Sequence, residues 1–363
     1  MSRLFFSLAF ALGCTAPVFA EDKPKPNALT PKEIAEGWLL LYDGETTFGW
    51  NVEGDAKVKD GKLVIGGEKK TILTPTTRFF AGDLMMESEG VGELHINGQS
   101  HTYAIGPKPT KFELQLRVTP GTNSSSSKKP ISTDSPVICE YKLDFSGPTS
   151  MHFEIPASGI FTVKSMKFKP HGTKPLFNGK NLDGWKVTQT DPKRTATKFE
   201  VTPTGELSAK NGPGDLQTEK QFDDFVLQFE CKTNGLALNS GIFFRCMPDA
   251  YQNGYEAQIQ NAYLGDRTKP IDYGTGAIYR RIAARKVVSN DNEWFTMTVA
   301  ARGAHIATWV NGYQTVDWTD DRKANENPRQ GLRTAKGHLS IQGHDPTTDL
   351  LFRNIRIAEL PKP

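Results

Sequence analysis

Apolar and polar residues alternate along short stretches of this chain, with the period of two that is typical of β-strands. In the second half the alternation recurs in five stretches, whose apolar positions are Phe225/Leu227/Phe229, Ile242/Phe244, Ile306/Thr308/Val310, Leu339/Ile341 and Phe352/Ile355/Ile357. Asn311-Gly312 is a hairpin signal between two of these stretches. The clearest helical pattern is Thr30–Glu36, where Thr30 can cap and Pro31 can stand first. Many short antiparallel strands bury their apolar faces best as two stacked sheets, so we predict an all-β sandwich or jelly roll.

Four sequence elements occur twice in the same order, which indicates that one module is present in two copies. LYDGETTFGW at 41–50 matches LFNGKNLDGW at 176–185, with an Asx-Gly turn and a Gly-Trp pair in each. The other matches pair residues 80–87 with 222–230, 111–118 with 293–299, and 163–168 with 352–357. A Pro/Gly linker at 169–175 separates the copies. We therefore expect two tandem sandwiches, the first module at 31–170 and the second module at 174–361.

The first twenty residues are expected to be a signal peptide. Arg3 precedes an apolar run from Leu4 to Leu12, and Ala20 ends a small-residue cleavage site. The apolar run is too short for a membrane span, and nothing else in the chain approaches that length. Leu12-Gly13-Cys14 resembles a lipoprotein acylation site, but Ala11 stands where a larger aliphatic residue is expected. We favour cleavage near Ala20, and hence a secreted or periplasmic protein, over lipid anchoring at Cys14.

The charge and cysteine content of the chain disfavour a nucleic-acid partner and a disulfide framework. Charged residues make up 23% of the chain and nearly balance, with a net charge of +3. The sequence has no cluster of basic residues that would bind the phosphate backbone of a nucleic acid, so we expect no nucleic-acid partner. Cleavage would leave Cys139, Cys231 and Cys246, an odd number that argues against a disulfide framework. Cys231 and Cys246 flank a predicted hairpin, where a cross-strand disulfide and two packed thiols are both open.

Two neighbouring predicted strands carry a polar face. In Gly254–Gln260, the side chains of Glu256, Gln258 and Gln260 share one face, opposite an apolar one. In Asn239–Cys246, alternation places Arg245 on the face opposite Ile242 and Phe244. An ordinary solvated sheet face accounts for this pattern as well as a ligand site does.

The second module, from about Lys174 to Leu360, resembles a known family. The elements that carry the resemblance are LFNGKNLDGW, FVLQFE, NSGIFFR, GYEAQIQN, TGAIY, NEWFTMTVAARG, WVNG, GHLSIQGH and FRNIRI. They are similar, in order, to the secreted bacterial 3-keto-disaccharide hydrolases (3-keto-glucoside 1,2-lyases and 3-keto-2-hydroxy-glucal hydratases). The resemblance implies a concanavalin A-like sandwich and a sugar substrate oxidised at C3. The first module shares only the opening and closing elements, so we interpret it as a degenerate copy.

The chemistry that the resemblance implies fits the polar face. A ketone at C3 acidifies the C2 hydrogen, so a base can remove it and the enolate expels the C1 substituent. The catalytic candidates are Glu256 as base or metal ligand, His344 as acid/base and Arg245 as enolate partner. The substrate-binding candidates are Asn239, Gln258, Gln260, Tyr279 and Gln342. A divalent metal, calcium or zinc, at Glu256 and His344 stays open, and no cofactor is certain.

Other functions also stay open. The family often has an aspartate shortly after its YExQ strand, where this chain has Gln260-Asn261, which would impair the site if that carboxylate were the base or a metal ligand. The alternative is a non-catalytic, lectin-like carbohydrate-binding protein, because the same fold hosts both functions. A serine hydrolase is disfavoured, since the chain has no G-x-S-x-G element. The expected partner is an oxidised sugar or glycoside, supplied by a separate sugar 3-dehydrogenase because this chain has no redox cofactor motif.

Overall fold

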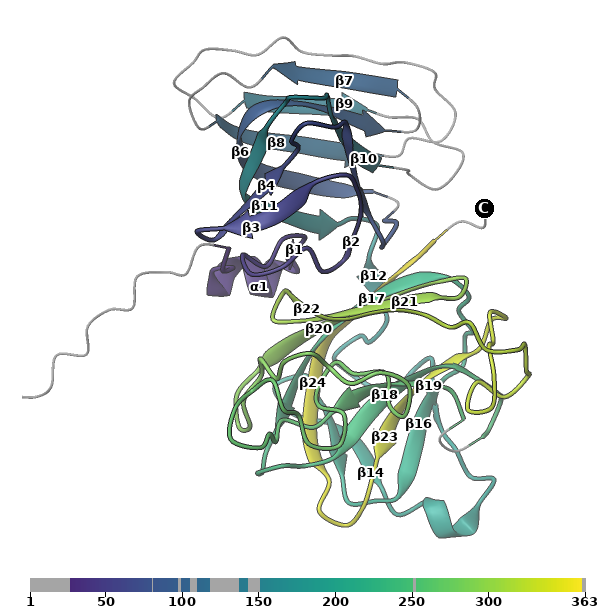
Figure 1. The fold of residues 1–363 in the computed structure, drawn as a ribbon. Coiled ribbons are helices and arrows are strands. Elements are labelled where there is room, and N and C mark those ends of the chain that lie inside the picture. Colours follow the sequence, from purple (N-terminus) through teal and green to yellow (C-terminus); the bar gives the residue numbers. More distant parts are fainter. Residues whose placement is uncertain are drawn as a thin grey trace, which may run out of the picture.

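The computed structural model describes residues 27–79, 81–96, 99–104, 110–117, 137–142, 151–250 and 253–360. This part of the chain is built almost entirely of β-strands (Figure 1). No helix in it is long and apolar enough to cross a membrane. The predicted signal peptide, with Cys14, lies outside the described residues, and so does the side chain of Cys139.

The predicted N-terminal helix is confirmed as α1, Pro31–Glu36. Its first turn is held by a capping box, in which the Thr30 hydroxyl accepts from the Glu33 backbone N–H and the Glu33 carboxylate accepts from the Thr30 backbone N–H. Gly37 ends the helix at a φ of 84°, a left-handed conformation that suits glycine.

The second module is a sandwich of two antiparallel sheets, which confirms the predicted fold class. One sheet has the order β14-β15-β24-β17-β20-β21-β22, with β12 also paired to β24, and the other has the order β13-β16-β23-β18-β19. Their apolar faces meet in one core that includes Leu227, Phe229, Ile242, Phe244 and Ile341. The strands are β12 Lys174–Pro175, β13 Trp185–Val187, β14 Lys198–Val201, β15 Leu207–Lys210, β16 Gly214–Thr218, β17 Phe225–Thr233, β18 Ser240–Cys246, β19 Tyr255–Ile259, β20 Phe295–Arg302, β21 His305–Val310, β22 Tyr313–Thr319, β23 His338–Gly343 and β24 Asp349–Glu359.

The first module is a single curved sheet in which one long strand, β6, takes part in both layers. The order is β2-β5-β10-β6-β11-β4-β3, with β7 and β8 also paired to β6, β9 to β8, and β1 to β11. The strands are β1 Leu39–Leu40, β2 Trp50–Glu53, β3 Ala56–Lys59, β4 Lys62–Ile65, β5 Thr71–Pro75, β6 Gly82–Ile96, β7 Gln99–Ala104, β8 Thr110–Arg117, β9 Val137–Lys142, β10 Met151–Ile155 and β11 Phe161–Pro170.

The two modules have equivalent strand orders, and their origin by duplication stays a prediction. The series β2-β5-β10-β6-β7 corresponds to β13-β16-β23-β18-β19 in the second module. On the other layer, β3-β4-β11-β6-β8 corresponds to β14-β15-β24-β17-β20, and β1 corresponds to β12. Beyond these strands the modules differ, because β9 runs parallel to β8 whereas β21 runs antiparallel to β20.

The repeated opening motif makes the same contacts in both modules. The indole Nε1–H of Trp50 donates to the Leu41 carbonyl at 2.5 Å, and that of Trp185 donates to the Leu176 carbonyl at 3.1 Å. In each turn the Asx side chain accepts from two backbone N–H groups, at Asp43 and at Asn178. The motif is thus a tryptophan-anchored turn that precedes the first strand of one layer.

The two modules lie next to each other (Figure 1), and one apolar cluster joins them. The hydrophobic cluster of the first module includes five residues of the second, namely Val226, Ala300, Ala307, Trp309 and Ala358. Polar contacts cross the same boundary: Trp309 Nε1 donates to the Leu40 carbonyl at 3.2 Å, and Arg285 lies 2.7 Å from the Asp43 carboxylate. The first module therefore covers the face of β17, β20 and β21 that points away from the core of the second module.

One predicted hairpin is wrong. We expected the strands of Cys231 and Cys246 to pair, but β17 pairs with β20 and β24, whereas β18 pairs with β19 and β23. Residues 234–239 thus cross from one sheet to the other. Both cysteines are free, buried thiols, and burial raises their pKa well above its ordinary value. The predicted hairpin at Asn311-Gly312 is confirmed, with both residues at positive φ.

Candidate functional site

A cavity of about 300 Å³ lies on the second module, against the face of the β18/β19/β23 sheet opposite the core. Strands supply Glu256 from β19 and Gln342 from β23. The other lining residues come from connections between strands and are Asn239, Tyr279, Arg280, Arg281, Arg329 and His344. Of the eight predicted site residues, the structure brings five together here: Glu256, His344, Asn239, Tyr279 and Gln342.

Local packing fixes the position of Glu256. Its neighbour across the β18–β19 pair is Phe243, and the next residue on the same face of β18 is Gly241. A Cβ atom on Gly241 would lie only 2.8 Å from the Glu256 side chain, so glycine leaves the space that the carboxylate occupies. Along the other edge of β19, the Tyr279 backbone N–H donates to the Glu256 carbonyl at 3.0 Å. The TGAIY element thus lies beside β19 and brings Tyr279 to the cavity.

Glu256 is buried, with 3% of its surface exposed, and burial raises the pKa of its carboxyl to about 7. The negative charges of Asp215 and Asp272 raise this pKa further, while Arg329 opposes the rise. Arg329 Nη2 lies 3.0 Å from Glu256 Oε2. A carboxyl with a pKa near neutrality can both accept and return a proton, as a general base requires.

Three arginines give the cavity a positive potential. The Arg329 guanidinium lies over the rings of Phe243 and Tyr279, at 5.0 and 5.8 Å from their centroids, and these contacts hold it beside Glu256. Arg281 donates to the Arg329 carbonyl, which ties the connection at 279–281 to that at 329. Such a cluster stabilises negative charge that develops on a bound molecule.

His344 forms a dyad with Asp345 at the rim. Its Nδ1 lies 2.7 Å from Asp345 Oδ2, and the side chain is 38% exposed. Burial raises the pKa of Asp345, but hydrogen bonds from Thr347 and His344 outweigh it, so the net shift is downward and the carboxylate stays charged. An ionised partner on one ring nitrogen orients the imidazole and leaves Nε2 for proton transfer.

Polar groups beneath the cavity are held by Asp272. Asn239 Nδ2 donates to its carboxylate at 2.6 Å, and Gln258 Nε2 donates to the same oxygen at 3.2 Å. Gln258 is fully buried and supports Asn239 through Asp272, so it is placed under the cavity rather than in its lining. Three buried acceptors on this face, Gln258 Oε1, Ser340 Oγ and Gln342 Oε1, have no hydrogen-bond partner. Buried polar atoms are normally satisfied, so these atoms have capacity for hydroxyl groups.

The expected position of Arg245 beside Glu256 is wrong. The pairing of β18 with β23 shifts register between Phe243 and Cys246, and Arg245 has a φ of 53°. This bulge breaks the alternation and turns the side chain away from the cavity. The guanidinium is fully buried and makes an ion pair with Asp224 at 3.0 Å. It also donates to the carbonyls of Gly303 and Arg333. Arg245 therefore fastens β18 to neighbouring loops.

Gln260 and Asn261 are also structural in this fold. The Gln260 amide donates to the Ala237 carbonyl at 3.1 Å and accepts from the Ala262 N–H, so it braces two loops outside the cavity lining. Asn261 is buried, and its amide bonds to Thr275, Ser289 and Asp291. The position at which an aspartate was expected thus lies outside the cavity lining.

Sequence reasoning missed Arg329, Arg280, Arg281 and Asp272. Arg329 follows a turn in which Asn327 accepts from the Arg329 backbone N–H, and nothing in its local sequence links it to Glu256, 73 residues earlier. Arg280 and Arg281 directly follow the TGAIY element, and that adjacency is the one signal that could have identified them.

The structure holds a candidate metal-binding triad, but not at Glu256 and His344. Among the described residues, the one group of three His, Cys, Asp or Glu side chains close enough to share an ion is His95, His152 and Glu154, in the first module. Glu256 and His344 belong to no such group in that part of the chain. A metal at the cavity stays a prediction.

Comparison with known proteins identifies the family of the second module. Residues 172–358 match the model of the 3-keto-alpha-glucoside-1,2-lyase-like domain family, which is just over half of the chain. The chain belongs to this family. The match does not include the first module. No curated protein matches the chain.

Similar solved structures cover about half of the chain. Two are from Parabacteroides distasonis and are provisionally described as glycosyl hydrolases. One is 22% identical (TM-score 0.43, covering 52% of this chain and 94% of that one), and the other is 28% identical (TM-score 0.40, covering 52% and 100%). A third, a carbohydrate-binding module from Bacillus subtilis, is 15% identical (TM-score 0.37, covering 50% and 99%). Family membership supports a carbohydrate-active jelly-roll protein.

Proposed function

We propose that the second module cleaves the glycosidic bond of 3-keto-glycosides by elimination, and adds water to the resulting 3-keto-2-hydroxy-glucal. The observation that carries the proposal is a buried carboxyl, Glu256, with a pKa near 7 inside a cavity lined by three arginines. Membership of the 3-keto-glucoside lyase-like family supports this substrate class.

The first step is proton abstraction from C2 by Glu256. The C2–H electron pair moves into the bond toward C3, and the ketone oxygen becomes an enolate. Negative charge thereby leaves Glu256, which becomes neutral, and appears on the substrate. Arg329, 3.0 Å from the carboxylate, remains close to both positions, so the transfer does not separate charge from its counter-ion.

The second step expels the C1 substituent. The enolate collapses to restore the C3 ketone, a C1–C2 double bond forms, and the C1–O bond breaks. His344 in its protonated form donates a proton to the departing oxygen, while Asp345 stabilises the imidazolium. Hydration reverses these roles: neutral His344 takes a proton from the water that adds at C1, and Glu256 returns its proton to C2. Asn239, Gln342 and Tyr279 would hold the ring hydroxyls and faces.

The test is release of the aglycone from a 3-keto-glucoside, with the unoxidised parent glucoside in parallel. We expect release from the keto compound alone. The Glu256→Gln substitution should slow it at least about 100-fold, the lower range for loss of a general base. In the wild type, kcat/KM should rise with pH through about 7, because the base acts in its deprotonated form.

The matched control is Glu219→Gln, an exposed acid outside the cavity, which should keep the wild-type rate. Equal rates for Glu256→Gln and the wild type would remove Glu256 from the mechanism. No release from the keto compound, with retained binding of the sugar, would instead favour a lectin-like module, which the unpartnered acceptors at Gln258, Ser340 and Gln342 also suit.

Export from the cytoplasm, with cleavage near Ala20, is part of the same proposal. A secreted lyase would act on sugars oxidised by a separate dehydrogenase, since the proposed steps use no redox chemistry.

A further inference from the structure

The first module carries a cluster of histidine and glutamate side chains on two paired strands. His95 and His152 are directly opposite each other in the β6–β10 pair, and Glu93 and Glu154 are opposite each other two residues along. Leu94 and Phe153, between them in sequence, are buried in the core. Alternation therefore directs all four polar side chains to the other face of the sheet.

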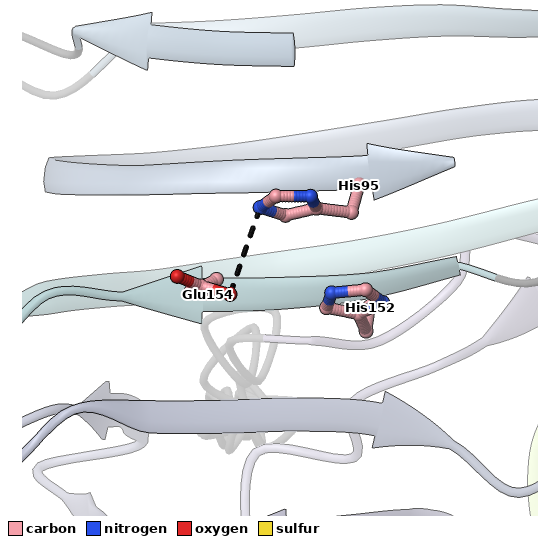
Figure 2. Close-up of side chains that lie close together, drawn as sticks. All are labelled: His95, His152 and Glu154. Carbon is pink, nitrogen blue, oxygen red and sulfur yellow. Dashed lines mark ion pairs between the residues drawn. The ribbon is translucent and has the colours of Figure 1, made fainter. Parts of the chain in front are cut away.

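The potential ligand atoms converge (Figure 2). One ligand atom each from His95, His152 and Glu154 lies within 4.8 Å of the other two. His95 Nε2 is 3.9 Å from Glu154 Oε2, and the two imidazole rings stack at 4.6 Å with an angle of 5° between their planes. Bonds of about 2.0–2.2 Å from one ion would bring such atoms to roughly 3.4 Å apart, so at least one imidazole must rotate out of the stack to direct its lone pair at the ion.

The cluster is incompletely satisfied without an ion. His95 Nε2 is buried and has no hydrogen bond of acceptable geometry, although Glu93 Oε2 lies 3.2 Å away. Lys70 Nζ lies 2.7 Å from Glu154 Oε1, so Oε2, which is the oxygen nearer His95, is left to bind a metal.

We propose that His95, His152 and Glu154 bind one divalent transition-metal ion, for which Zn²⁺ is the suitable probe. Two imidazoles and one carboxylate form a donor set that suits zinc, with the fourth position left to water or a ligand. The ion would lie on the layer that corresponds, strand for strand, to the candidate site of the second module, since β6 and β10 are the counterparts of β18 and β23. This site is independent of the proposed lyase chemistry.

The test is metal binding to the full chain without an affinity tag, after treatment with a chelator. Titration with Zn²⁺ in competition with a chromogenic chelator should give one ion per chain. Co²⁺ in its place should show the visible absorption of a four-coordinate site. His95→Asn, His152→Asn and Glu154→Gln should each lower Zn²⁺ affinity at least about 10-fold.

Two further variants keep the result interpretable if the histidine substitutions disturb folding. Lys70, whose side chain is 52% exposed, places a positive charge beside Glu154 that repels a bound cation, so Lys70→Met should tighten Zn²⁺ binding several-fold. His171→Asn replaces a histidine of the linker, outside the cluster, and should leave affinity unchanged.

Three results would each overturn the assignment. They are no stoichiometric Zn²⁺ binding by the wild type, unchanged affinity in folded His95→Asn and His152→Asn proteins, or loss of binding in His344→Asn instead. Because the readout is metal binding, failure here leaves the lyase proposal untouched, and failure of aglycone release leaves this one untouched.

Discussion

The two modules share a strand order and differ in what they present on the equivalent layer. In the second module, Glu256, Gln342 and their neighbours face a cavity closed by arginines from connecting segments. In the first, the strands equivalent to β18 and β23 carry His95, His152 and Glu154. The strand order is the same in both modules, and the side chains on this layer differ.

The difference lies mostly in the connections. Between β19 and β20 the second module has residues 260–294, which supply Asp272, Tyr279, Arg280 and Arg281, whereas in the first module the equivalent strands β7 and β8 end at Ala104 and begin at Thr110. The first module passes from one layer to the other within the single strand β6, but in the second module the connection 234–239, which ends with Asn239, interrupts that passage. The cavity of the second module is thus lined mainly by residues from connections between strands.

The largest effects should come from the tryptophan anchors, which test whether the copies are energetically equivalent. Trp50 and Trp185 are both 7% exposed and donate to equivalent carbonyls. Trp50→Ala and Trp185→Ala should each lower the free energy of unfolding by about 3–5 kcal/mol, because each leaves a large cavity. Urea unfolding followed by circular dichroism measures this.

Trp294→Ala is the matched control. That ring is only partly buried and lies 4.0 Å from the Arg353 guanidinium, so its loss should cost about 1 kcal/mol. A small loss for Trp50→Ala beside a large one for Trp185→Ala would show that the first module contributes little to stability.

An intermediate effect on stability should come from Glu256, because the proposed function uses the ionised form of this buried acid, and ionisation destabilises the folded chain. Its pKa is about 7 in the folded chain against an ordinary 4.5. Between these values the folded state holds a proton that the unfolded state has lost, so the free energy of unfolding falls as pH rises through this window. Glu256→Gln should therefore be more stable than the wild type at pH 8, by up to about 3 kcal/mol, with no such advantage at pH 4. Thermal unfolding at the two pH values measures it, and an equal difference at both would contradict a raised pKa.

The smallest effect on stability is expected at two ion pairs in equivalent positions, at the bulges of β11 and β24, and we expect it to differ between them. Lys164 lies 3.2 Å from Glu87 in the first module, and Arg353 lies 2.7 Å from Glu230 in the second. Glu230 is the more buried acid and also accepts from Asn354, so Glu230→Gln should cost about 1 kcal/mol. Glu87→Gln should cost less than about 0.5 kcal/mol, as a half-exposed pair does. Chemical denaturation of both variants compares them, and the reverse order would mean that burial does not govern these pairs.

The sequence predicted the features that depend on local patterns. Alternation located the strands, the Asx-Gly and Gly-Trp motifs located the repeat, and the face with Glu256 was correctly separated from the core face. The position of Arg245 was not predictable this way, because one bulged residue reverses the alternation and bulges leave no mark in a pattern of apolar residues.

Long-range assembly was the other limit. Arg329 reaches Glu256 from a connection far along the chain, and β17 and β18 separate into different sheets although they are adjacent in sequence. Both depend on which strands pair, and pairing is decided by the total apolar surface buried rather than by neighbouring residues.

Because the modules share an apolar contact, the boundary of the family domain differs from the boundary of the part of the chain that packs together. The family match begins at residue 172, yet Val226, Ala300, Ala307, Trp309 and Ala358 pack into the hydrophobic cluster of the first module. A chain that began at residue 172 would present this patch, with a large tryptophan in it, to water. In this protein the first module shields that patch, so the part of the chain that packs together is longer than the part that the family match defines.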